Sequence, residues 1–547
     1  MTPYAFPLLI KQLLVTPVAQ RSKKEIVYRD QARFTYPQLI ERINRLGSSL
    51  SNLNIAIGST VAVMDYDSNR YLECYFAVPM LGATLMKVNI RLSPEQIIYT
   101  LKHSEAETLI IHTDFLPIIR QAEEELRFKH IIYITDGADI NSSLLDGEYE
   151  RLLSKGSPHH EFPEFDENTR ATLYYTTGTT GLPKGVYFSH RQLVLHCLTV
   201  LATMSQASEN GKHSRNDVYM PLTPMFHAHA WGYPYIATLC GWKQVYPGKF
   251  DAENVALLVL KEKVSFSHCV PTVLNLVISS ETGRNAAFNN WKVLIGGSGL
   301  PRALAQRALS QGIDVYCGYG MSESCPLLTL AQIKSDSLEA TETDDDKSMD
   351  IRLTQGMPIL MAQVRVVDEE MNCIPEDGRT LGEVVVRTPY LTEGYHANAE
   401  ATASLWRGGW MHTGDMGRFD KDGYLHLADR QKDVIKSGGE WISSVQLEDL
   451  ISQHPGVQEA AVIGIDDAKW GERPLALVVK DQKNEVSAET LKLHLKQFVK
   501  TGALCSYAIP DQYIFVSALS KTSVGKLDKK KLREAYCKIS IAETSCN

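Results

Sequence analysis

A run of threonines and glycines, closed by one lysine, is the stretch of the chain best suited to holding a polyphosphate. It follows the apolar segment 171–175 and consists of Thr176, Thr177, Gly178, Thr179, Thr180, Gly181, Leu182, Pro183 and Lys184. Glycines let backbone N–H groups approach an anion, hydroxyls add donors and Lys184 adds positive charge. A Walker A loop requires Gly-Lys-Ser/Thr, whereas Pro183 and Gly185 flank this lysine. We therefore expect a different kind of phosphate loop, with a plain surface turn as the alternative.

Two further glycine-rich turns follow apolar segments that resemble strands. Segment 293–295 leads into Gly296, Gly297, Ser298 and Gly299, and segment 314–317 leads into Gly318, Tyr319, Gly320, Met321, Ser322 and Glu323. The first turn approaches the dinucleotide pattern G-x-G-x-x-G, but Arg302 stands where the last glycine is required. A dinucleotide site is therefore not predicted there.

The elements that must position these turns alternate between strand and helix patterns. Strands are expected at 26–28, 60–64, 108–111, 131–134 and 171–175, and helices at 36–53 and 71–81. Such alternation is typical of a parallel sheet covered on both faces, with ligands at the carboxyl ends of its strands. Beyond an acidic segment, 335–350, which we expect to be a solvated loop, 362–367 and 382–387 favour antiparallel strands. Segments 460–463 and 476–479, with helices at 445–453 and 489–499, predict a small α+β unit.

Composition limits the class of protein. A chain of 547 residues is expected to form two or more domains. Its net charge of −8, from 64 acidic and 56 basic residues, argues against a nucleic-acid partner. The ten cysteines include no C-x-x-C pair, so we expect reduced thiols and a cytoplasmic location. The N-terminus lacks a signal-peptide pattern, and the apolar segment 75–86 is too short to span a bilayer. Peripheral membrane contact and a homodimer stay open.

Six blocks of sequence, taken in order, resemble the adenylate-forming (AMP-binding) superfamily of acyl-CoA synthetases, luciferases and adenylation domains. They cover nearly the whole chain and lie at 176–186, 224–227, 319–323, 413–415, 429–433 and 521–526. Segments 436–444 and 469–474 look most like medium-chain fatty-acid–CoA ligases. The resemblance implies an α/β fold with a large domain of parallel-rich sheets and a β subdomain at 1–430, and a small mobile α+β domain at 431–547.

The resemblance also implies roles for single residues. It assigns Glu323 to Mg²⁺, a hard cation that prefers oxygen ligands, Tyr319 to stacking on adenine beside the Gly297–Gly299 turn, and Asp415 to the two ribose hydroxyls. It places Arg430 at the ribose or phosphate, and Lys526 at the substrate carboxylate and α-phosphate. Lys432 is the expected hinge, and His227 is expected between the acyl pocket and the pantetheine tunnel. The remaining implied ligand-binding residues are Lys436, Gly438, Gly439, Glu440 and Trp441.

The implied activity is an ATP-dependent fatty acid–CoA ligase that forms an acyl-adenylate and uses Mg²⁺ and coenzyme A. Three alternatives stay open: a fatty acyl-AMP ligase that loads a carrier protein, a ligase for another small carboxylic acid, and a catalytically silent nucleotide-binding regulator. No third ligand accompanies His227 and His229, so a metal centre is not predicted there.

The chain departs from the pattern of its relatives at several positions. Ser322 replaces the more frequent threonine and keeps its hydroxyl, Ser520 stands where proline is common, and Met86-Lys87 stands where His-Thr is common. Lysines in a cluster such as 529–531 are usually solvated. Near the C-terminus, only its place in the motif at 521–526 distinguishes Lys526 as a candidate site residue. We also expect Trp231 to gate the acyl pocket.

Overall fold

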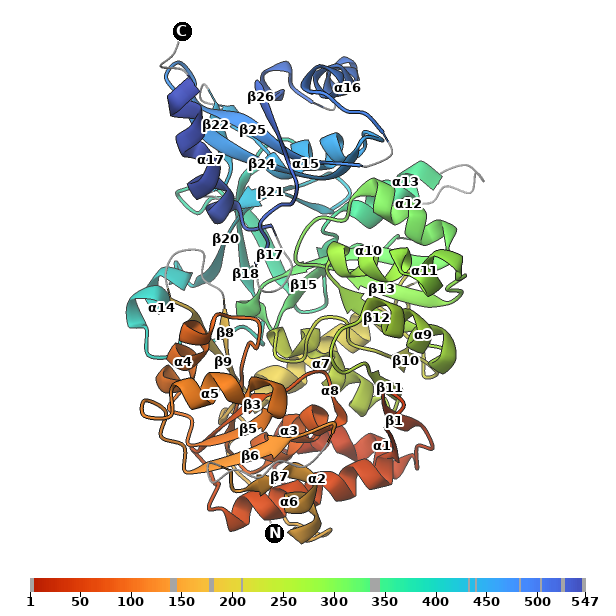
Figure 1. The fold of residues 1–547 in the computed structure, drawn as a ribbon, viewed down its shortest axis with the longest axis vertical. Coiled ribbons are helices and arrows are strands. Elements are labelled where there is room, and N and C mark those ends of the chain that lie inside the picture. The colour runs from red at the N-terminus through yellow and green to blue at the C-terminus, as the bar shows by residue number, and fades with distance from the viewer. Residues whose placement is uncertain are drawn as a thin grey trace.

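A seven-stranded sheet forms the lower part of the body (Figure 1). The computed structural model describes residues 4–137, 145–176, 182–207, 210–334, 345–430, 433–437, 440–481, 484–501, 504–522 and 527–543. The strands lie in the order β7 (Gly147–Glu148), β6 (His130–Ile134), β5 (Thr108–His112), β3 (Thr60–Met64), β4 (Thr84–Lys87), β8 (Arg170–Thr176) and β9 (Lys184–Ser189). All neighbours are parallel except β8 and β9, which are antiparallel.

A nine-stranded sheet completes the body. Its order is β16 (Met357–Pro358), β15 (Leu327–Leu330), β14 (Ile313–Gly320), β13 (Trp291–Ile295), β12 (Phe266–Cys269), β10 (Val218–Tyr219), β11 (Lys243–Tyr246), β1 (Glu25–Tyr28) and β2 (Ala32–Thr35). The strands from β14 to β1 are parallel, and antiparallel strands close both edges. The carboxyl ends of β12, β13 and β14 therefore meet at one edge, where ligands usually bind in such sheets.

Helices between the two sheets carry the main core. All 12 residues of α3 (Asn69–Met80) are buried, and one apolar cluster joins side chains of both sheets, such as Val61 and Leu294. α2 (Tyr36–Asn52) begins at Thr35, which forms a capping box with Gln38. The other helices before residue 406 are η1 (Ile10–Leu14), α1 (Val15–Ala19), α4 (Pro94–His103), η2 (Thr113–Phe115), α5 (Leu116–Gln121), α6 (Tyr149–Lys155), α7 (His190–Ser205), η3 (Ala228–Gly232), α8 (Tyr233–Leu239), α9 (Ala252–Glu262), α10 (Pro271–Ser279), α11 (Glu281–Asn285), α12 (Arg302–Ser310), η4 (Ser322–Ser324), α13 (Asp345–Leu353) and α14 (Ala399–Leu405).

Two smaller sheets follow. β17 (Gln363–Val367), β18 (Gly382–Arg387), β20 (Trp410–Phe419) and β19 (Trp406–Arg407) form an antiparallel sheet, with β21 (Leu425–Arg430) beside β20. The last sheet contains β23 (Glu440–Ile442), β22 (Ile435–Ser437), β25 (Gly471–Lys480), β24 (Val457–Asp467) and β26 (Gln512–Val516). It is accompanied by α15 (Ser444–Ser452), α16 (Ala488–Lys500), η5 (Ser506–Ala508) and α17 (Lys529–Glu543), at the top of Figure 1.

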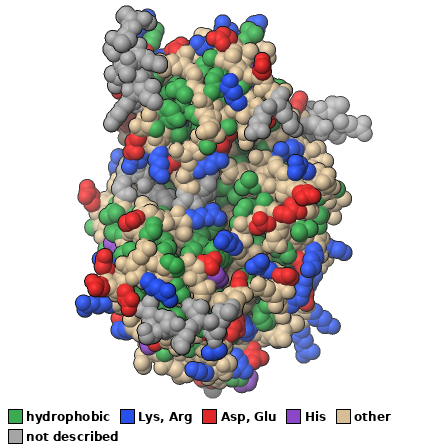
Figure 2. Space-filling view, viewed as in Figure 1, with side chains coloured by type: hydrophobic (Ala, Val, Ile, Leu, Met, Phe, Trp, Pro, Cys, Tyr) green, Lys and Arg blue, Asp and Glu red, His purple; other side chains and the backbone are tan. Residues whose placement is uncertain are grey.

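Contacts near β21 join this C-terminal part to the body. Asp429 accepts a hydrogen bond from Ser444 and lies 3.6 Å from the ammonium of Lys529. Lys529 also pairs with Glu448 at 3.0 Å. The division at residues 430 and 431 stays a proposal, with one sheet ending at Arg430 and the next beginning at Ile435. Figure 2 shows lysine and arginine side chains at the level where the C-terminal part meets the body.

The predicted α/β class is confirmed, and two local predictions are wrong. The acidic segment 335–350 was expected to be a solvated loop, but residues 345–350 belong to α13, and residues 335–344 lie outside the described part of the chain. Arg352 of this helix pairs with Asp314 at 2.6 Å, and Asp350 pairs with Arg302. Lys529 was expected to be solvated, yet its side chain is only 11% exposed. In both places the partners are distant in sequence, so the ion pairs could not be read from the local pattern. Among the described residues, no helix has the length and apolar character needed to cross a membrane.

Candidate active site

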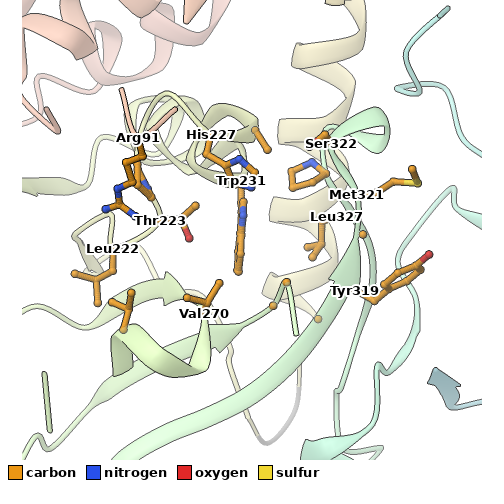
Figure 3. A pocket seen from close by; sticks show the side chains of 18 residues that line it. Arg91, Leu222, Thr223, His227, Trp231, Val270, Tyr319, Met321, Ser322 and Leu327 are labelled. Carbon is orange, nitrogen blue, oxygen red and sulfur yellow. The ribbon is translucent and has the colours of Figure 1, made fainter. Parts of the chain in front are cut away.

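A cavity of about 60 Å³ opens where β12, β13 and β14 end (Figure 3). Most of the lining comes from the segment before α8, from the residues after β12 and β13, and from the end of β14 with the residues up to the start of β15, while Arg91 comes from the loop after β4. It comprises Arg91, Leu222, Thr223, Pro224, His227, Ala228, Trp231, Val270, Val273, Gly296, Gly297, Gly318, Tyr319, Gly320, Met321, Ser322, Pro326 and Leu327. Several predicted site residues, from three separate motifs, therefore meet at one cavity.

A left-handed turn projects Trp231 into this cavity. The φ angles of Ala228, His229, Ala230, Trp231 and Gly232 are all positive, between 44° and 80°. Such a run is strained for residues with a Cβ, and strain of this kind concentrates at functional sites. His229 is buried, and its Nε2 lies 2.8 Å from the hydroxyl of Thr172. The turn therefore separates the two histidines, and no group of three potential metal ligands occurs among the described residues.

The indole of Trp231 fits because Gly296 has no side chain. A Cβ added to Gly296 would lie 2.8 Å from the indole, and the His268 ring lies 5.0 Å from it. His227, at the start of the same segment, lines the cavity, and its backbone N–H donates to the carbonyl of Pro224 at 2.9 Å. Asp67 holds this segment by accepting from the Met225 N–H at 2.7 Å, and burial raises the pKa of Asp67 to about 7.

Glu323 lies behind the cavity lining, in a cluster with Tyr395 and Lys184. The residue is 6% exposed, and its Oε1 accepts a 2.6 Å hydrogen bond from the Tyr395 hydroxyl. The Lys184 ammonium lies 4.9 Å from the centre of the Tyr395 ring. Burial raises the pKa of the Tyr395 phenol, which therefore stays a donor to Glu323. Tyr395 was not predicted as a site residue, although its place beside Gly394 in an irregular segment is visible in the sequence.

Tyr319, Asp415 and Arg430 form a second cluster on the other side of β14. The Tyr319 hydroxyl donates to Asp415 Oδ2 at 2.7 Å, and Arg430 Nε lies 3.4 Å from Asp415 Oδ1. Burial raises the pKa of the Tyr319 phenol. Figure 3 shows the Tyr319 ring pointing away from Trp231, and it packs against Leu328 and Val384. Both carboxylate oxygens of Asp415 thus already have partners. A ribose that binds to Asp415 would share these oxygens with Tyr319 and Arg430 or replace them as partners.

The predicted phosphate loop joins two antiparallel strands, unlike a strand–loop–helix phosphate site. Thr176 of β8 pairs with Lys184 of β9, so Lys184 stands on a strand. The turn of Gly297, Ser298 and Gly299 faces the C-terminal part, because a Cβ on Gly299 would lie 3.7 Å from Val445. Lys436 is exposed in β22 opposite Trp441, and its backbone N–H donates to Glu472 at 2.8 Å.

Several predicted site residues lie outside the described residues. They are Thr177, Gly178, Thr179, Thr180, Gly181, Lys432, Gly438, Gly439 and Lys526. Glu440 and Trp441 are described only as backbone in β23. The described part of the chain therefore places Lys184 and Glu323 in one cluster and Tyr319, Asp415 and Arg430 in another. The roles assigned to all the predicted site residues remain predictions.

Comparisons with known proteins match almost the whole chain. Residues 15–396 match the family described as "AMP-binding enzyme", and residues 446–526 match the "AMP-binding enzyme C-terminal domain". A "Long-chain-fatty-acid--CoA ligase" of Thermus thermophilus is 39% identical, over 94% of this chain and 93% of that protein. A "Medium-chain-fatty-acid--CoA ligase" of Ectopseudomonas oleovorans is 33% identical, over 92% and 91%. An anthranilate CoA ligase structure with anthranoyl-AMP is 25% identical, with a TM-score of 0.86 over 98% and 99% of the two chains.

Proposed function

The chain belongs to the AMP-binding enzyme family, and from this premise we propose that it is a fatty acid–CoA ligase that works through an acyl-adenylate. Its relatives are acid–thiol ligases, and the chain is an enzyme of that class. ATP and a fatty acid would give acyl-AMP and pyrophosphate, after which the thiol of coenzyme A would displace AMP.

One observation carries the proposal: the segment Met321–Glu323 separates the cavity from the charged clusters. Met321 and Ser322 line the cavity, whereas the carboxylate of Glu323 bonds Tyr395, whose ring lies against Lys184. An acid in the cavity and a phosphate held near Lys184 would therefore meet beside this segment. Attack of a carboxylate on a phosphate brings two anions together, so fixed cations at this point favour the reaction.

The residues fit a bound Mg²⁺ as follows. Mg²⁺ is usually held by one or two carboxylates together with substrate phosphates and water, and Glu323 supplies one buried carboxylate there. When bound, the ion neutralises charge on the phosphates. In our proposal Lys184 and the adjoining loop bind phosphate, Asp415 and Arg430 orient the ribose, His227 borders the path of the acyl group, and Lys526 stabilises the charge that develops.

Tyr395→Phe tests whether the hydrogen bond from the Tyr395 hydroxyl holds the Glu323 carboxylate in place for Mg²⁺. Loss of a hydrogen bond to a charged group costs about 1.5–3 kcal/mol, so the Mg²⁺ concentration for half-maximal activity should rise by about tenfold or more. Tyr424→Phe is the matched control, because its hydroxyl donates to the carbonyl of Gln332 outside the cavity lining. Titration of Mg²⁺ at fixed ATP measures the effect, and equal Mg²⁺ requirements in both variants would refute the assigned support.

For the acid, we propose a medium-chain fatty acid. The relatives named for long-chain and medium-chain acids support a fatty acid, while a similar structure acts on anthranilate. A volume of about 60 Å³ holds about four to six waters. A medium acyl chain therefore requires the indole of Trp231 to move aside.

Trp231→Ala should shift the preference towards longer acids. Removing the indole leaves apolar space, and each further methylene that becomes buried contributes about 0.8 kcal/mol, or roughly fourfold in kcat/KM. Acids from C2 to C16 are assayed, with Trp231→Phe as the control that keeps an aromatic ring. An unchanged chain-length optimum in Trp231→Ala would show that the indole does not limit the pocket.

The acceptor is tested by supplying coenzyme A or a phosphopantetheine carrier protein to the same enzyme with ATP and an acid. We expect acyl-CoA, AMP and pyrophosphate in equal amounts. Transfer to the carrier protein with no acyl-CoA would favour the acyl-AMP ligase alternative instead.

A further inference from the structure

Lys87 is a buried amine that the proposed mechanism does not use. It ends β4 and has no solvent exposure. Its Nζ has no hydrogen-bond partner among the described residues. A buried polar group without a hydrogen-bond partner is costly, so other contacts must offset part of that cost.

The amine lies between two tyrosine rings. Nζ is 4.6 Å from the centre of the Tyr174 ring and 5.3 Å from that of Tyr75. Burial lowers the pKa of Lys87, and Cys325 and His229 are the titratable groups that interact with it besides the tyrosines. An amine between aromatic faces is held through its N–H groups and the negative faces of the rings. Lys87 therefore restricts where the Tyr174 ring can lie.

Tyr174 in turn holds the segment that carries Glu323. Lys87 and Tyr174 are paired across β4 and β8. The Tyr174 hydroxyl donates a 2.5 Å hydrogen bond to the carbonyl of Ser322, the residue before Glu323. Tyr174 is 1% exposed, so its ring has little freedom. The Tyr395 hydroxyl donates a hydrogen bond to the Glu323 side chain. The Tyr174 hydroxyl donates one to the backbone directly before Glu323, so two tyrosines hold this residue.

We propose that Lys87 is a positioning residue for Glu323: its amine fixes the Tyr174 ring, and the Tyr174 hydroxyl fixes the Ser322 carbonyl. The inference rests on the proposed role of Glu323 in binding Mg²⁺ with ATP. Small displacements of a positioned group can cost about 100-fold in rate. Since Lys87 does not line the cavity, its effect should fall on Mg²⁺-dependent ATP binding and spare the affinity for the fatty acid.

The test compares Lys87→Met, which keeps the length and removes the nitrogen, with Tyr174→Phe and the double variant. Calorimetry measures ATP binding with Mg²⁺ and with EDTA, and a melting curve measures stability. Each single variant should weaken Mg²⁺-dependent binding by about threefold to tenfold, with binding in EDTA unchanged. Both residues act through one chain of contacts. The double variant should therefore bind ATP with Mg²⁺ about as tightly as the single variant that has the lower affinity.

Two further variants serve as controls. Lys102→Met removes a half-exposed lysine that pairs with Glu125 at 2.9 Å, and it should bind as the wild type does. Lys87→Gln keeps an N–H donor and should recover part of the lost affinity, and it replaces Lys87→Met if that variant does not fold.

Fully additive effects, or equal losses with Mg²⁺ and with EDTA, would overturn the proposal. So would a lower melting temperature in Lys87→Met with unchanged Mg²⁺-dependent binding. These binding results are independent of the ligase reaction: a wild-type protein that binds ATP with Mg²⁺ but activates no acid would refute the proposed function alone.

Discussion

Lys526→Ala is expected to slow acyl-adenylate formation by about two to three orders of magnitude, as for the loss of a fixed electrostatic donor. Thioester formation from supplied acyl-AMP should be nearly normal, because the carboxylate that Lys526 is expected to contact is by then joined to the α-phosphate and no longer carries its charge. The two half-reactions are measured separately, the first as acid-dependent pyrophosphate exchange and the second as acyl-CoA released from acyl-AMP.

Lys530→Ala is the matched control for this lysine. Lys530 is half-exposed and lies 3.8 Å from Glu534, so its removal should change neither half-reaction. Lys529 is unsuitable because it is buried against Asp429 and Glu448. Equal losses in both half-reactions of Lys526→Ala would show that the lysine is structural.

Lys432→Pro is expected to allow acyl-AMP to form and accumulate while acyl-CoA production falls by about 100-fold, the scale of a misplaced reacting group. Lys526 and the loop at 436–440 lie far apart in sequence, yet both must act at the same α-phosphate and carboxyl carbon. A rotation of the C-terminal part about residue 432 would bring each in turn. Proline fixes φ near −65° and so prevents a rotation that changes this angle.

Contacts on both sides of Lys432 make the rotation testable. Asp429, before it, pairs with Lys529, and Asp433, after it, pairs with Arg533. Rotation about residue 432 should break the contact between Asp429 and Lys529. It should keep the contact between Asp433 and Arg533, since these two residues would move together. Lys432→Ala removes the charge without fixing φ and should keep both half-reactions. If Lys432→Ala shows the same defect as Lys432→Pro, or if proline slows both steps equally, the hinge assignment is wrong.

Local pattern was sufficient for the strands and glycine turns that build the site. The strand at 60–64 was predicted with the bounds of β3, because an apolar run bounded by polar residues is recognisable without tertiary information. The turn at 296–299 follows β13 as predicted. The strand predicted at 314–317 is longer in the structure: residues 318–320 of the second predicted turn are the end of β14, where they pair with β15, and only 321–323 follow the strand. Their meeting at one edge follows from parallel pairing.

Features that depend on distant contacts were not predictable. Tyr395 bonds Glu323 across 72 residues, and only the fold makes them neighbours. In the left-handed turn, three non-glycine residues with positive φ precede Trp231: Ala228, His229 and Ala230. No local rule predicts positive φ for alanine or tryptophan. The burial of Lys87 and Lys529 likewise follows from partners on other elements.

The central claim is that the protein activates its acid as an adenylate before coenzyme A takes part. Exchange of labelled pyrophosphate into ATP tests this directly, in reactions that contain or lack a medium-chain acid, Mg²⁺ and coenzyme A. We expect the exchange of pyrophosphate into ATP to require both the acid and Mg²⁺ and to proceed without coenzyme A. Exchange that depends strictly on coenzyme A would contradict the two-step mechanism.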